Sequence, residues 1–208
     1  MKKILITGGA GFIGSSFIKF LIKKKNISLI ISIDNYYSGS INNHIKSKKV
    51  KYIKGDTRKI NNIKYLKKIN FDLVYHFGEF SRIYPSFKFN DLCWKFNSIG
   101  TYEVIKFCLS KKAKLIYSAS SAATDDKKNL SPYSWSKYTS NKLIKNYSEW
   151  FGLKYAIVYF YNVYGPGQIT NGNMTAVIGI FETQYLNDKP LTVVKPGTQK
   201  EILLILMI

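Results

Sequence analysis

Short apolar runs alternate with longer amphipathic segments along most of this chain. The apolar runs are rich in β-branched residues and short enough to be buried strands, whereas the amphipathic segments place apolar residues at helical spacing. This alternation predicts an α/β fold with a doubly wound parallel sheet covered by helices on both faces. The expected strands are Lys3–Thr7, Ile27–Asp34, Val50–Lys54, Leu73–Phe77, Lys114–Ser118 and Tyr155–Tyr161, and the expected helices are Phe12–Lys24, Asp91–Leu109 and Pro132–Phe151.

The pattern changes after residue 165. Tyr164–Asn173 is polar and rich in glycine, so we expect it to lead out of the sheet. A helix at Thr175–Asn187 and a strand at Leu191–Val194 are predicted to follow. The expected organisation is a sheet domain over residues 1–165, part of a second, substrate-binding region over 166–199, and a separate tail over 200–208.

Composition narrows the class of protein. The hydrophobic content of 46% supports a globular core, and no apolar run approaches the roughly 20 residues of a membrane span. Cys93 and Cys108 have neither metal-ligand nor redox spacing, which favours a reducing, cytoplasmic compartment and no metal site. The net charge of +20 comes almost entirely from Lys, because Arg occurs only at Arg58 and Arg82. Surfaces that read nucleic acid favour Arg, so we expect no nucleic-acid partner.

A glycine-rich turn follows the first predicted strand. Gly8, Gly11 and Gly14 have the spacing of a dinucleotide-binding loop, in which the amides of the next helix, from Phe12 and Ile13 onward, face the pyrophosphate. Asp34 ends the second strand, where a carboxylate accepts from ribose hydroxyls and repels a 2′-phosphate. The combination predicts a Rossmann-like domain that binds NAD, with NADP as the alternative.

A second cluster of candidate residues begins the last long helix. Ser131 is a plausible N-cap and Pro132 fits the first turn. Tyr133 and Lys137 are four residues apart, so they share one helix face, where an ammonium stabilises a phenolate. Alone, this pair is typical of any amphipathic helix. Ser120 and Ser121 both offer a hydroxyl at the end of the fifth strand, and we favour Ser121. Together with the glycine loop and this hydroxyl, the pair predicts a general-base site.

These motifs resemble those of the NAD-dependent epimerase/dehydratase family, the extended short-chain dehydrogenases/reductases. Asn97-Ser98-Ile99-Gly100-Thr101 and Asn162-Val163-Tyr164-Gly165-Pro166 are also similar to family segments. His76-Phe77-Gly78-Glu79 stands where the family usually has His-Leu-Ala-Ala, so Gly78 and Glu79 are departures. The further cofactor contacts implied by the resemblance are Asn35, Asp56, Thr57, Phe77, Gly78 and Asn97, together with Tyr133 and Lys137.

The resemblance also implies a chemistry. Tyr133 would take the proton of a sugar hydroxyl, Lys137 would hold the nicotinamide ribose and Ser121 would bind the reacting oxygen. The implied substrate is a nucleotide sugar contacted by Glu79, Ser121 and Asn162, and the implied assembly is a homodimer formed through the helices Asp91–Leu109 and Pro132–Phe151.

Several activities remain open within the family. Dehydratases of the family carry Thr-Asp-Glu at the catalytic hydroxyl, whereas this chain has Ser121-Ala122-Ala123 without an acid. This difference favours a UDP-hexose 4-epimerase-like enzyme. A 4,6-dehydratase, a reductase and a non-catalytic NAD-binding protein are the alternatives.

The last nine residues, Lys200–Ile208, depart from the family pattern, which usually continues Lys-or-Arg, Arg-Asp-Phe. Deleting one base from a codon string for Lys-Arg-Asp-Phe-Thr-His-Ile-Asp-Asp yields the observed Lys-Glu-Ile-Leu-Leu-Ile-Leu-Met-Ile. We therefore expect a frameshifted tail and a truncated substrate domain, so that the chain binds NAD with little or no turnover. A natural apolar tail that packs on the core is the alternative. The tail is expected to expose apolar residues with β character.

Overall fold

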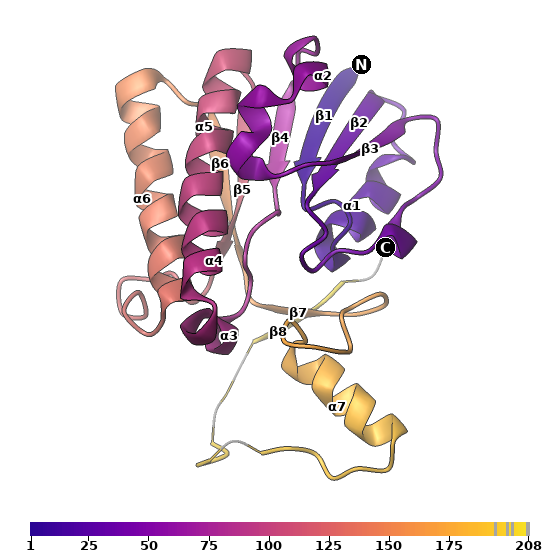
Figure 1. Ribbon diagram of the computed structural model, residues 1–208, viewed down its shortest axis with the longest axis vertical. Coiled ribbons are helices and arrows are strands. Elements are labelled where there is room, and N and C mark those ends of the chain that lie inside the picture. Colours follow the sequence, from indigo (N-terminus) through magenta and orange to yellow (C-terminus); the bar gives the residue numbers. More distant parts are fainter. Residues whose placement is uncertain (194, 199, 201, 207–208) are drawn as a thin grey trace.

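The computed structural model describes residues 1–193, 195–198, 200 and 202–206 (Figure 1). Its main sheet has six parallel strands in the order β3-β2-β1-β4-β5-β6. The strand order reverses between β1 and β4, which is where a doubly wound sheet opens a crevice at the carboxyl ends of its strands. The strands are β1 (Lys2–Thr7), β2 (Ile27–Asp34), β3 (Val50–Lys54), β4 (Leu73–His76), β5 (Lys114–Ser120) and β6 (Tyr155–Phe160). The predicted fold class is confirmed.

Two hydrophobic cores lie on opposite faces of this sheet, as strand geometry requires. In β1, Leu5 belongs to one core, whereas its neighbours Ile4 and Ile6 belong to the other. The Leu5 face is covered by α5 (Gly100–Lys111) and α6 (Pro132–Phe151), and the opposite face by α1 (Phe12–Leu21) (Figure 1). The apolar pattern of the strands therefore fixes which helix packs on which face.

The predicted long helix over Asp91–Leu109 is three segments. These are α4 (Asn90–Trp94), a π-helical turn η3 (Lys95–Ile99) and α5. The π turn contains Asn97, whose side chain binds the backbone of Phe80 outside the helix. Because π turns are rare and often mark functional sites, this interruption makes Asn97 a candidate site residue.

The remaining differences are at element ends. The first helix stops at Leu21 and the chain then turns, whereas the prediction ran to Lys24. Strand β5 continues to Ser120 because Ala119 and Ser120 still pair with β6. The last long helix matches its prediction, with Ser131 accepting from the amide of Ser134 at its start. Short elements without a predicted counterpart are η1 (Ile41–Asn43), η2 (Thr57–Asn62), α2 (Lys64–Lys67) and α3 (Ile83–Lys88).

The chain leaves the main sheet after β6. Strand β7 (Asn162–Tyr164) pairs in parallel with β8 (Leu203–Ile205), and α7 (Val177–Leu186) lies beside this small sheet (Figure 1). Helix α7 is shorter than predicted. The strand predicted at Leu191–Val194 is not found over residues 191–193, and residue 194 lies outside the described residues, as do 199, 201, 207 and 208 of the end of the chain. Ile202 and Leu203–Ile205 are exposed, in agreement with the expectation that the tail exposes apolar residues.

Candidate active site

The glycine loop lies against the end of β4. Gly8 has a φ of +74°, and a Cβ on it would come within 2.6 Å of the Gly78 amide nitrogen. A Cβ on Gly14 would lie 2.1 Å from the Gly8 carbonyl oxygen. These two positions therefore need glycine for close backbone packing. At Gly11 the nearest atom to such a Cβ is 3.3 Å away, so this side of the loop is more open.

The start of α1 suits an anion. Gly11 is the N-cap and no side chain caps the helix. The first amides of the helix, including those of Phe12 and Ile13, have no intrahelical acceptor, and they lie at the positive end of the helix dipole. The loop and helix start thus fit the pyrophosphate of a dinucleotide.

The carboxylate of Asp34 is fixed beside this loop. Its Oδ2 accepts from the amide of Ala10 at 2.9 Å and its Oδ1 from the amide of Tyr36 at 2.8 Å. The next residue, Asn35, accepts from the amide of Tyr37 at 3.0 Å. Each carboxylate oxygen accepts more than one hydrogen bond, so Asp34 keeps acceptor capacity for a ribose hydroxyl.

Asp56 and Thr57 lie at the end of β3. The Asp56 carboxylate accepts from both Nε and Nη2 of Arg58, and this hydrogen bonding lowers the pKa of Asp56 below its usual value. Asp56 also begins η2 by accepting from the Arg58 amide at 2.9 Å. Thr57 is buried, and its Oγ1 is 2.6 Å from the position of a Cβ on Gly100. These residues fix the local backbone, and their contact with the cofactor stays a prediction.

Asn97 is fully buried and its polar atoms are engaged by the protein. Its Oδ1 accepts from the amide of Phe80 at 2.7 Å, and its Nδ2 donates to the Phe80 carbonyl and to the Ser136 hydroxyl, both at 3.0 Å. The residue thus ties the loop after β4 to α6. Phe77 and Gly78 lie earlier in that loop, where their amides donate to the carbonyl and the hydroxyl of Thr7 at 3.1 Å.

The helix start presents Tyr133 and Lys137 at the ends of β4 and β5. Tyr133 is 8% exposed and Lys137 3%. The Tyr133 ring shares a buried cluster with Ala122, the residue after Ser121, so the end of β5 packs near the phenol. In the described part of the chain, no side chain hydrogen-bonds the Tyr133 hydroxyl. Ser121 itself is half-buried and its amide donates to the Phe160 carbonyl at 3.0 Å.

A chain of hydrogen bonds with a definite direction runs beneath these residues. The Gly78 amide donates to Thr7 Oγ1, so the Thr7 hydroxyl is free to donate to His76 Nδ1 at 2.7 Å. His76 Nε2 then donates to Thr101 Oγ1 at 3.0 Å, and the Thr101 hydroxyl donates to Glu79 at 3.0 Å. Burial lowers the pKa of His76 to about 4, with the charge of Lys137 acting in the same direction and that of Glu79 opposing it. His76 is therefore a neutral relay between β1 and Glu79.

Glu79 ends this chain. Its side chain is 2% exposed, and it forms an ion pair with Lys137. Tyr117 donates to the same carboxylate at 3.0 Å, and the Ser118 hydroxyl lies 3.3 Å from it. The substrate contact predicted for Glu79 stays a prediction, and both carboxylate oxygens are engaged by the protein. The sequence analysis missed Thr101, Tyr117 and Ser118, and the departure at Glu79 was the one signal that pointed to them.

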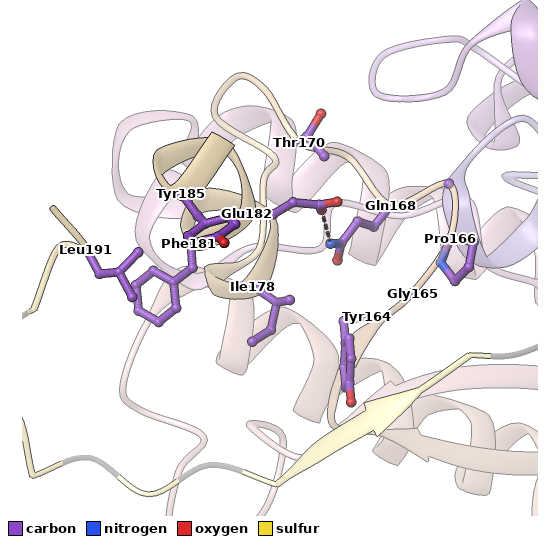
Figure 2. A pocket seen from close by; sticks show the side chains of 11 residues that line it. Tyr164, Gly165, Pro166, Gln168, Thr170, Ile178, Phe181, Glu182, Tyr185 and Leu191 are labelled. Carbon is purple, nitrogen blue, oxygen red and sulfur yellow. Dashed lines mark hydrogen bonds between the residues drawn. The ribbon is translucent and has the colours of Figure 1, made fainter. Parts of the chain in front are cut away.

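The opposite part of the site lies beyond β6. Asn162 begins β7, where its amide donates to the Ile202 carbonyl at 3.3 Å. Beyond Tyr164 a cavity of about 600 Å³ opens between the Gly165–Gln168 loop and α7. Figure 2 shows Gln168 and Glu182 pointing toward one another in it, joined by a 2.8 Å hydrogen bond. Ile178 and Phe181 give the cavity an apolar wall.

The described residues contain neither a candidate membrane span nor a candidate metal cluster. None of the helices there is long and apolar enough to cross a membrane. Nor do three or more His, Cys, Asp or Glu side chains gather there as a metal site.

The comparisons with known proteins point to one family. The sequence model of the NAD dependent epimerase/dehydratase family matches residues 4–201. A putative UDP-glucose 4-epimerase of Methanocaldococcus jannaschii is 32% identical over 94% of this chain and 67% of its own length. A dTDP-D-glucose 4,6-dehydratase of Dictyostelium discoideum is 31% identical over 93% of this chain, which spans half of that relative.

A solved structure extends the likeness to three dimensions. The UDP-N-acetylglucosamine 4-epimerase of Methanobrevibacter ruminantium, in complex with UDP-N-acetylmuramic acid, superposes with a TM-score of 0.87 at 27% identity. The match covers 98% of this chain and 69% of that one. Both 4-epimerases and a 4,6-dehydratase are therefore among the similar proteins.

Proposed function

Because this chain belongs to the NAD-dependent epimerase/dehydratase family, we propose that the protein is a nucleotide-sugar 4-epimerase in which Tyr133 is the general base. The observation that carries this proposal is the placement of Tyr133 and Lys137. Both lie on one face at the start of α6, beside the end of β5 and across from the Gly8 loop at the crevice of the sheet. NAD is the cofactor of the family and, when bound, supplies reversible hydride acceptance.

The residues of the chain have separate tasks in this proposal. The Gly8–Gly14 loop and the first amides of α1 bind the pyrophosphate, and Asp34 accepts from the adenosine ribose. Lys137 directs one remaining N–H toward the nicotinamide ribose. Tyr133 removes the proton of the sugar hydroxyl and returns it, while Ser121 donates a hydrogen bond to the reacting oxygen.

The end of β5 favours epimerisation over dehydration. Loss of water from the sugar needs an acid near the leaving hydroxyl, and Ala122 and Ala123 are buried at the positions that follow Ser121. The nearest acid along the chain, Asp125, is exposed and accepts from the Tyr138 hydroxyl at 2.8 Å. The buried carboxylate of Glu79 is already paired with Lys137. This is why we prefer the epimerase to the 4,6-dehydratase.

The cavity beside α7 is the place we assign to part of the substrate. It begins two residues after Asn162, combines an apolar wall with the polar pair Gln168 and Glu182, and lies in the region predicted to bind the sugar nucleotide. The chain spans about half to two thirds of the length of these curated relatives.

The test begins with NAD titration by calorimetry, followed by a panel of nucleotide sugars observed at the absorbance of NADH. We expect Tyr133→Phe to keep NAD affinity and to lose transient reduction of NAD by about 10²-fold or more. Tyr147→Phe, the same change on the same helix away from the cluster, is the matched control.

The outcomes separate the candidates. A product of unchanged mass with an inverted hydroxyl supports the epimerase, whereas a product lighter by one water identifies the dehydratase. NAD binding without reduction by any sugar points to the non-catalytic alternative. Failure to bind NAD, or full activity in Tyr133→Phe, contradicts the proposal.

A further inference from the structure

Glu79 is a buried carboxylate at a position where chemistry is concentrated. Three groups donate to it: the hydroxyls of Thr101 and Tyr117 and the ammonium of Lys137. Burying a carboxylate is costly unless it is paired and hydrogen-bonded. The donors satisfy that condition, and they come from α5, β5 and α6, so Glu79 holds three elements together at one point.

Lys137 is equally constrained. Its side chain is 4% exposed, and its ammonium donates to Glu79 and, at 2.6 Å, to the Ser118 carbonyl. The ring of Tyr117 lies 4.9 Å from the same nitrogen. An ammonium has three N–H donors, so two are committed to the protein and one remains. The carboxylate therefore determines where the last donor points.

The pair has an electrostatic consequence for Tyr133. A lone ammonium four residues away on the same helix face would stabilise the phenolate. The adjacent carboxylate of Glu79 opposes that effect, because the two charges of a contact pair nearly cancel at a third group.

We propose that Glu79 is a positioning residue that orients Lys137 and offsets its positive charge at Tyr133. The inference rests on the proposed roles of Tyr133 and Lys137. It goes beyond them because it gives Lys137 mainly the task of a directed hydrogen-bond donor, with a weaker part in activating the phenol.

The other titratable groups around the pair do not obscure this effect near neutral pH. Burial keeps His76 neutral, with a pKa of about 4, and raises the pKa of Tyr117 well above its ordinary value. Burial also raises the pKa of Cys93 on α4. Arg82, at the start of α3, donates to the Met174 and Ser81 carbonyls, and its guanidinium remains cationic. Arg82 therefore supplies a constant charge in every variant compared below.

The test measures ionisation of Tyr133 in the protein without cofactor, by NMR of ¹³C-labelled tyrosine with Tyr133→Phe to assign the signal. Four chains are compared: the parent, Glu79→Gln, Lys137→Met and the double variant. We expect the phenolate to form at a lower pH in Glu79→Gln than in the parent, because the ammonium then acts alone. In Lys137→Met it should form at a higher pH than in the parent, and in the double variant close to the parent.

The controls make each outcome decisive. Glu149→Gln removes an exposed carboxylate on the same helix and should leave the titration unchanged. If Glu79→Gln fails to fold, the comparison of Lys137→Met with the double variant decides, because the double variant leaves no unpaired charge. The inference is overturned if Tyr133 ionises at the same pH in the parent and in Glu79→Gln, or at the same pH in Lys137→Met and in the double variant. Failure of the parent to bind NAD would instead contradict the proposed function and leave this order of titrations intact.

Discussion

Strand β2 and the strands that follow α6 bury their residues very differently. β2 buries six of its eight positions, whereas β6 buries none and all three positions of β8 are exposed. Among the helices, α5 contributes six buried residues, but Gly179 is the single buried residue of α7. The part of the chain that carries the proposed cofactor loop and catalytic pair thus has its own core, and the described part that carries the cavity has almost none.

This difference separates the two tasks of the site. Positioning of Tyr133, Lys137 and the glycine loop depends on helices and strands that are fixed by deep packing, which is what precise chemistry requires. The cavity beside α7 is enclosed by segments with few buried contacts, which are expected to open more readily. Cofactor binding should therefore survive changes that abolish substrate binding.

The largest expected effect comes from a matched pair of leucines. Leu5 in β1 is fully buried and Leu203 in β8 is 43% exposed. Leu5→Ala should lower the free energy of unfolding by about 4 kcal/mol, because it leaves a cavity in the core. Leu203→Ala should change it by less than about 0.5 kcal/mol. Urea unfolding followed by circular dichroism measures both, and similar losses for the two variants would contradict the comparison.

A slightly smaller change in the free energy of unfolding should follow from protonation of His76 at low pH. Its pKa is about 4 in the folded protein, below the ordinary 6.5, because burial disfavours the charged ring. As the pH falls, the ring therefore takes up a proton in the unfolded chain before it does so in the folded protein. The contribution of the neutral ring to the free energy of unfolding is complete above about pH 6.5 and is lost progressively down to about pH 4. The loss amounts to about 3 kcal/mol.

Urea unfolding between pH 7.5 and 4.5 tests this expectation. The variant His76→Asn should be less stable at neutral pH and should show a flatter dependence on pH than the parent. His44→Asn, which changes the second histidine of the chain, is the control and should keep the slope of the parent. An unaltered slope in His76→Asn would show that the burial of this ring does not govern acid stability.

The smallest change in the free energy of unfolding is expected for substitutions on the outer surface of α4, η3, α5 and α6. Exposed apolar side chains lie along α4, η3 and α5 and on α6, and we infer that they form the face of a homodimer. The residues are Trp94, Ile99, Tyr102, Trp135, Trp150 and Phe151.

Substitution of Ile99, which is 42% exposed, tests this face. Ile99→Glu should leave unfolding free energy within about 0.5 kcal/mol and convert dimers to monomers in sedimentation experiments. Phe20→Glu, an equally exposed apolar position on α1, is the control and should leave the assembly state unchanged. A parent chain that sediments as a monomer would refute the inferred face.

Much of the architecture could be predicted from the sequence because the signals were local. The bounds of β2, β3 and α6 match their predictions, since β-branched runs and a Ser131 cap with Pro132 mark them directly. The π turn at Asn97 could not be predicted, because it depends on Phe80, which is distant along the chain. Strand β8 likewise exists through its pairing with β7.

The sequence by itself determined the parallel α/β sheet, the glycine loop at its crevice and the pairing of Tyr133 with Lys137 on one helix face. Each follows from periodicity or spacing within a few residues. The environment of Lys137 was decided only by the tertiary structure. Glu79, Thr101 and Tyr117 are separated along the chain. They meet because the register of β4 and β5 places Tyr117 beside His76, and because α5 packs Thr101 against the same histidine.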